Sequence, residues 1–153
     1  MKLTPLCYPY KVVPTEKLLG GKAYRLLEAI PFTNEHGEAD EVPKGFVFDG
    51  FSIPFVRRFL SEGGWNIAEA ALHDWQYLTG TPRKIADKSL ALNMKRSGEH
   101  ENAIVIVGVG ITWIGWVSYA RYTKRRDRDP DLVYSRIAGT KERAEFIART
   151  ITV

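Results

Sequence analysis

The chain has 153 residues, 44% of them hydrophobic and 26% charged, so it can bury an ordinary core as a single domain spanning 1–153. Its one cysteine, Cys7, cannot form an intramolecular disulfide, which fits folding in a reducing cytoplasm. The N-terminus lacks the long apolar run of a signal peptide. A protein of this kind that acts outside the cell that made it would need a route other than Sec export.

The net charge is +4, and the excess of basic residues is concentrated in the run from Arg121 to Arg126. Such a run is most often the solvated end of a helix. Anionic lipid, nucleic acid and an acidic protein partner remain alternatives, and the charge alone does not decide between them. We expect no specific nucleic-acid partner.

Residues 1–54 carry the signals of β-strands. The expected strands are Tyr10 to Val13, Lys22 to Phe32 and Glu41 to Phe48, with a turn through Asn34 to Gly37 between the last two. Prolines punctuate each piece. This pattern predicts a small antiparallel strand region.

After Pro54 the pattern becomes helical, with a helical core over 55–122. The expected helices are 55–60, 66–79, 82–97, 101–122 and, in the tail, 140–149. Residues 123–153 are expected to form a charged loop and a C-terminal tail. The predicted fold class is α+β, in which the N-terminal strands pack on a helical hairpin and on a long apolar helix.

The segment from Ala103 to Tyr119 contains no Asp, Glu, Lys, Arg or His. Its length is borderline for a membrane span, and its glycines would allow close backbone contacts. We expect a buried central helix enclosed by protein, with a transmembrane helix as the alternative. The aromatic residues at 113, 116, 119 and 122 recur every three positions, which favours a core or partner-facing stripe over a lipid anchor.

The densest group of chemically capable residues is His73-Asp74, followed by Asp87 on the next helix. On the helix of His73, Glu69 and Gln76 are expected to form the polar side. Because the turn at 79–81 makes the two helices antiparallel, Asp87 is expected to accept a hydrogen bond from one imidazole nitrogen of His73. The other nitrogen could then take a proton from water.

Asp74 lies about 100° round its helix from His73 and would face a different neighbour. The obvious neighbour is the loop at Asp49-Gly50, whose backbone carbonyls could complete an oxygen cage for a calcium ion. The competing interpretation is that His73, Asp74 and Asp87 form a buried polar network that only locks the hairpin. A nucleophilic role for Ser52 is not favoured, because the serine lacks a glycine-flanked elbow.

These motifs resemble those of two known families. The Phe46 to Pro54 and His73 to Asp87 patterns, followed by a glycine- and tryptophan-bearing apolar helix, resemble a phage and prophage family catalogued as domain of unknown function 1353. Within it, His-Asp-x-x-Tyr followed by Ala-Asp resembles the catalytic helices of phospholipase A2, most closely the compact parvovirus type.

The second resemblance implies roles for four residues. His73 would activate water, Asp74 would bind calcium with loop carbonyls, Asp87 would orient the histidine, and Tyr77 would support this network. The first resemblance implies the setting: a virion protein, made in the host cytoplasm and placed in the phage tail beside other virion proteins. It would hydrolyse lipid esters at the host envelope with calcium, on a phospholipid membrane surface. The alternative is a structural tail protein in which the same network only holds the fold.

Overall fold

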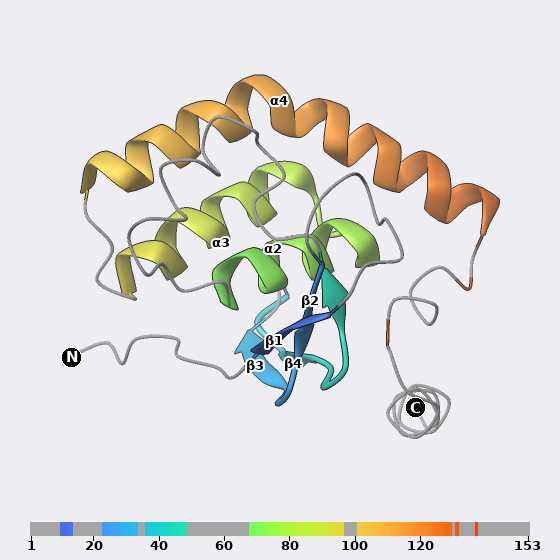
Figure 1. Ribbon diagram of the computed structural model, residues 1–153. Helices are drawn as coiled ribbons and strands as arrows, with labels where there is room; N and C mark the ends of the chain where they lie inside the picture. The colour runs from blue at the N-terminus through green and yellow to red at the C-terminus, as the bar shows by residue number, and fades with distance from the viewer. Residues whose placement is uncertain are drawn as a thin grey trace.

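The computed structural model of the protein describes residues 10–13, 23–33, 36–48, 68–96, 101–129, 131 and 137. In this part of the chain, short strands form one layer and three helices are stacked above it, with α4 outermost (Figure 1). The predicted α+β class, with antiparallel strands followed by a helical hairpin and a long apolar helix, is confirmed. The helices expected at 55–60 and 140–149 lie outside the described residues.

The strands form a three-stranded antiparallel sheet and a separate hairpin. In the sheet, β2 (Ala23–Leu26) lies between β1 (Tyr10–Val13) and β5 (Val47–Phe48). The hairpin pairs β3 (Ile30–Thr33) with β4 (Ala39–Val42).

The expected strand from Lys22 to Phe32 is therefore two strands. After Leu26, whose backbone bonds with Gly45 and Phe46, the chain bends and enters the hairpin. The expected strand 41–48 divides similarly, at a turn where Gly45 has a φ of 85°.

Helix α2 (Ala68–Thr79) is buried from Ala68 to Leu78. It contacts β4 and β5 on one side and α3 and α4 on the other (Figure 1). Glu69 and Gln76, expected to form the polar side of this helix, are both almost fully buried. Their environment is set by tertiary packing on both sides of the helix, which the periodicity of one helix does not contain.

The turn between α2 and α3 (Arg83–Arg96) forms as predicted. Gly80 adopts a φ of 94°, a conformation that a residue with a Cβ rarely takes. The N–H groups of Gly80 and Thr81 donate to the Gln76 carbonyl, which ends α2 in a Schellman-like cap. This cap turns the chain back so that α3 lies against α2.

Helix α4 (Glu101–Arg128) continues past the expected end at 122 to Arg128. By length and composition, its segment Ile104–Arg128 could cross a membrane. Of the most apolar 18-residue stretch in this segment, however, only 17% is buried inside the protein. The expectation that 103–119 is enclosed by protein is wrong. Only the inner side of α4 is packed: Val107 and Ile111 form a cluster with Leu90 and Met94 of α3.

We expected the glycines of α4 to lie against other backbone, and neither Gly108 nor Gly115 does so. A Cβ on Gly115 would lie 3.1 Å from the Tyr77 hydroxyl, which is a side-chain contact, and a Cβ on Gly108 would meet nothing within 4 Å.

The aromatic residues of α4 do not form one stripe. Trp113 and Trp116 are exposed, whereas Tyr122 is buried and Tyr119 packs against the core. A spacing of three residues advances by about 300° round a helix, so each residue lies about 60° from the one before. The four aromatic side chains therefore wrap from the outer side of α4 to its inner side.

Candidate functional site

Two helices bring the candidate site together. His73 and Tyr77 lie one turn apart on α2, and Arg83 and Asp87 lie one turn apart on α3. Since residues four apart share one side of a helix, each pair projects in one direction. The tight turn at Gly80 makes these two sides face each other.

The Asp87 carboxylate is the centre of the site. Its Oδ1 accepts a hydrogen bond from the Tyr77 hydroxyl at 2.6 Å and lies 3.1 Å from Nε2 of His73. Its Oδ2 accepts from Nε of Arg83 at 3.1 Å. The contact predicted between His73 and Asp87 is confirmed, and three donors from two helices converge on one carboxylate.

Burial alone would raise the pKa of Asp87, but hydrogen bonds from His73 and Tyr77, the charge of His73 and the hydrogen bond from Arg83 together hold it below its ordinary value. Burial, together with the hydrogen bond to Asp87 and the charge of that carboxylate, raises the pKa of the Tyr77 hydroxyl far above its ordinary value. At neutral pH Asp87 is thus ionised and Tyr77 is protonated.

These protonation states fix the tautomer of His73. An ionised carboxylate can only accept hydrogen bonds, so Nε2 of His73 must carry the proton that it shares with Asp87. In the neutral imidazole, Nδ1 then has a free lone pair, and among the described residues no side chain or backbone group donates to it. A histidine held in this way can accept a proton at Nδ1.

Solvent reaches this pair only in part. The exposed fractions of the side chains are 11% for His73 and 20% for Asp87. Most of the pair is therefore shielded from solvent, which strengthens its hydrogen bonds.

Tyr77 is held by aromatic neighbours as well as by Asp87. Its ring lies 4.1 Å from the imidazole of His73, measured between centroids, and meets the rings of Tyr119 and Tyr122 edge-on. Gly115 leaves room for its hydroxyl beside α4. These contacts limit the positions that the hydroxyl can take and so direct it at Asp87.

Arg83 is the site residue that the sequence reasoning missed. Its signal was present, since an Arg four residues before an Asp on a helix is a pairing that forms readily. Its role here is to neutralise the carboxylate from the side opposite His73.

The predicted calcium ligands are only partly placed. Asp74 is buried on α2, whereas Asp49 and Gly50 lie outside the described residues. Calcium needs about six to eight oxygen ligands, and within the described ranges no three His, Cys, Asp or Glu side chains are grouped as a metal site. Calcium binding stays a prediction.

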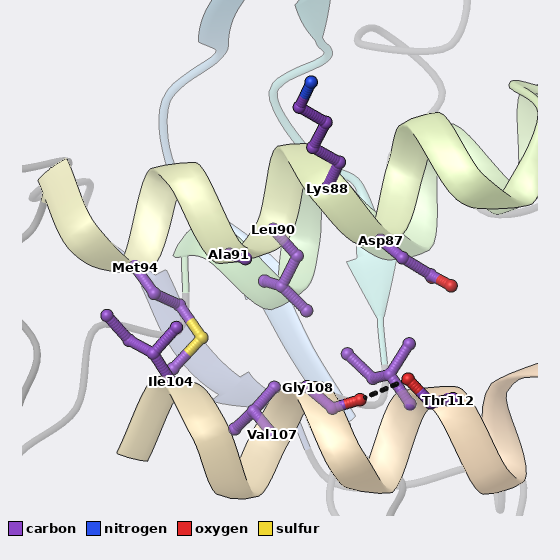
Figure 2. A pocket seen from close by; sticks show the side chains of 10 residues that line it. Asp87, Lys88, Leu90, Ala91, Met94, Ile104, Val107, Gly108 and Thr112 are labelled. Carbon is purple, nitrogen blue, oxygen red and sulfur yellow. Dashed lines mark hydrogen bonds between the residues drawn. The ribbon is translucent and has the colours of Figure 1, made fainter. Parts of the chain in front are cut away.

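A cavity of about 220 Å³ lies between α3 and α4 and reaches Asp87 at one end (Figure 2). Apolar side chains make up most of its wall, and they are Leu90, Ala91, Met94, Ile104, Val107 and Ile111. Asp87 and Thr112 lie together near one end, while Met94 and Ile104 lie at the other. The cavity suits an apolar group whose polar end lies toward Asp87.

The fold and the site thus define a small α+β protein with a His-Asp-Tyr-Arg network on a helical hairpin. The model of the family described as "Protein of unknown function (DUF1353)" matches residues 24–106, and the chain belongs to that family. The match includes β2 to β5, both hairpin helices with the whole network, and the start of α4. No curated protein and no solved structure matches the chain.

Proposed function

We propose that this protein hydrolyses carboxylic esters of lipids, with His73 as the general base and Asp87 as the residue that orients it. The observation that carries the proposal is the 3.1 Å contact between His73 Nε2 and Asp87, which leaves Nδ1 as a proton acceptor. The apolar cavity that ends at Asp87 supports a lipid as the substrate class.

The chemistry would run in two proton transfers. Nδ1 of His73 takes a proton from water as the water oxygen attacks the ester carbonyl carbon. The carbon–oxygen bond to the alcohol then breaks, and the imidazolium returns the proton to the departing alkoxide. Asp87 stabilises the imidazolium that forms between the two steps, with Tyr77 and Arg83 holding the carboxylate in place.

The setting we propose is a bacteriophage virion, in which the protein is a tail component that acts at the host envelope. It rests on the resemblance of the 46–54 and 73–87 motifs to a phage and prophage family. A calcium ion held by Asp74 with Asp49 and Gly50 is part of the same proposal, and it would supply positive charge to the carbonyl oxygen.

A second candidate is a structural role, in which the network only locks the hairpin. It is favoured by the number of contacts between α2 and α3, since Gln76 also donates to Ser89 at 3.4 Å. Both candidates need Asp87, but only hydrolysis needs a proton acceptor at position 73.

The test is the variant His73→Gln, assayed for fatty acid release from mixed phospholipid vesicles. Glutamine can still donate to Asp87 but cannot act as the base, so we expect activity to fall by at least about a hundredfold with little change in Tm. His36→Gln, at an exposed histidine outside the network, is the matched control and should keep full activity.

The calcium prediction is measured in the same assay by adding a chelator, which should lower activity as His73→Gln does. Wild-type protein without lipid hydrolysis between pH 6 and 9, with or without calcium, would overturn the enzymatic proposal. A virion that carries His73→Gln and remains infectious would then favour the structural role.

A further inference from the structure

The outer side of α4 carries a long apolar stripe, defined here as Val105, Val109, Trp113 and Trp116. Their exposed fractions are 62%, 54%, 77% and 58%. The spacing of four, four and three residues places them on one side of the helix, opposite the packed Val107 and Ile111. In Figure 1 this helix is the outermost of the three, so the stripe lies on the surface of the molecule.

Exposed tryptophan side chains in such a row are unusual for a water-facing surface. Apolar patches of this kind mark places where another surface binds. Ile106, which is also exposed, widens the stripe on its flank. The stripe therefore needs an apolar partner over about three turns of helix.

The C-terminal end of the same helix is strongly basic. Arg121, Lys124, Arg125 and Arg128 are exposed, whereas Arg126 turns inward, where its Nη1 donates to the Tyr77 carbonyl at 3.4 Å. Asp127 on the helix, with Asp129 and Asp131 just beyond it, opposes this charge in part. The partner of α4 must therefore be apolar along most of its length and negatively charged at one end.

We propose that the outer side of α4 docks in the plane of an anionic phospholipid bilayer. The stripe enters the boundary between headgroups and acyl chains, and the exposed basic residues contact lipid phosphates. Tryptophan favours this boundary, because its ring is apolar and its N–H can reach polar headgroups.

The packing of the inner side excludes a simple span of the bilayer. Val107 and Ile111 contact Leu90 and Met94, and Gly115 lies against Tyr77, so a spanning α4 would have to leave α2 and α3. A second copy of the chain is disfavoured as the partner, because it adds no net negative charge to the basic end. Anionic lipid satisfies both the apolar stripe and the charge.

This surface goes beyond the proposed hydrolysis, since binding to lipid requires no chemistry at His73. It also relates the two sites. The cavity beside Asp87 lies against the inner side of α4, so docking would bring it within about one helix diameter, roughly 10 Å, of the lipid headgroups.

The test is flotation of the full chain with vesicles of phosphatidylcholine alone or with 30% phosphatidylglycerol, a fraction chosen to be about that of an anionic membrane. We expect binding to the anionic vesicles, with a blue shift of tryptophan fluorescence, and weaker binding at high salt. The double variant Trp113→Gln/Trp116→Gln should lower the partition coefficient by about tenfold or more. Leu92→Gln, at an exposed leucine of α3, is its control and should bind as wild type.

The contribution of the basic residues is tested with the double variant Lys124→Glu/Arg125→Glu, which should lower binding to anionic vesicles by about tenfold or more. Lys95→Glu/Arg96→Glu makes the same change at an exposed pair in the last turn of α3 and should have a much smaller effect. His73→Gln should bind like wild type, so a failure of hydrolysis and a failure of docking can be told apart.

Three outcomes would overturn the proposal. The first is wild-type protein that does not bind anionic vesicles. The second is a dimer in solution that Trp113→Gln/Trp116→Gln dissociates, which would assign the stripe to a second copy. The third is bound protein that resists extraction with high salt and alkali, which would indicate a spanning helix.

Discussion

Asp87 concentrates the interactions of the site on a single side chain. Its two oxygens accept from His73, Tyr77 and Arg83, and no two of these donors do the same work. Arg83 balances the negative charge of the carboxylate, and the Tyr77 hydroxyl holds Oδ1 at 2.6 Å. The carboxylate in turn orients the imidazole of His73. Because the donors come from both helices, the carboxylate couples the chemistry of the site to the stability of the hairpin.

We expect Asp87→Asn to lower the free energy of unfolding by about 1.5–3 kcal/mol at pH 7, because charge-assisted hydrogen bonds are replaced by weaker neutral ones. The pKa of Asp87 is below its ordinary value in the folded protein, so its ionised form stabilises the fold. That contribution is complete above the ordinary pKa of Asp, about 4, and is lost as the pH falls through the lower folded pKa. Urea unfolding between pH 2 and 7 measures both effects.

The control for this variant is Asp127→Asn, which removes an exposed carboxylate on α4 outside the network. It should leave the stability within about 0.5 kcal/mol of wild type at neutral pH. If Asp87→Asn lost as much stability on acidification as wild type, Asp87 would not be the source of the acid sensitivity.

At the scale of elements, the limits of the hairpin could be predicted well from the sequence. Gly80 and Pro82 marked the end of α2 and the start of α3, and both predicted ranges are within two residues of the structure. The contact between His73 and Asp87 followed from the number of residues on each side of that turn. Local rules suffice where a turn of only a few residues connects two helices.

Which helix lies at the centre of the fold could not be predicted from the sequence. The helix with the longest uncharged apolar run, α4, is largely open to solvent along that run, whereas α2 is buried despite Glu69 and Gln76. Hydropathy measures what a helix can bury but not which neighbours cover it. Arg83 was missed for a related reason, because an i,i+4 pair with Asp87 is ordinary on a helix until His73 and Tyr77 of α2 meet the same carboxylate.

Gly108 and Gly115, on the inner side of α4, allow the same substitution to be compared at two sites. Gly108→Ala should raise the free energy of unfolding by about 0.5–1 kcal/mol, since alanine favours helix and its Cβ would meet nothing within 4 Å. Gly115→Ala should lose that gain, because its Cβ would lie 3.1 Å from both the Tyr77 hydroxyl and Cγ2 of Ile111. Chemical denaturation of the two variants measures the difference.

The result for Gly115→Ala also reports on the site. Tyr77 is held to Asp87 at 2.6 Å, so a Cβ pressing on its hydroxyl should disturb that hydrogen bond. Equal stabilisation by both substitutions would contradict the close approach of α4 to Tyr77.

In the whole molecule, α2 lies between the strand layer and the other two helices. The strands cover one side of it, and α3 and α4 cover the other (Figure 1). Tyr122 reaches from α4 into the same core cluster as the strands and α2, and Ile137 pairs with Phe46 beyond α4. An α4 docked on lipid would leave the strand layer directed away from the membrane, with the His73 network between them.

This layering predicts the order in which the molecule opens. The amides of α2 should exchange hydrogen most slowly, because exposing them requires the loss of packing on both sides of the helix, which amounts to global unfolding. The last two turns of α4, from Arg121 to Arg128, should exchange faster, since most of their side chains are exposed and Tyr122 is their main buried anchor. Hydrogen exchange measured by mass spectrometry on α2 and α4 peptides, compared with the free energy of urea unfolding, checks both statements. Anionic vesicles should slow exchange in α4 and leave α2 unchanged. Fast exchange in α2 of the free protein would contradict its central position.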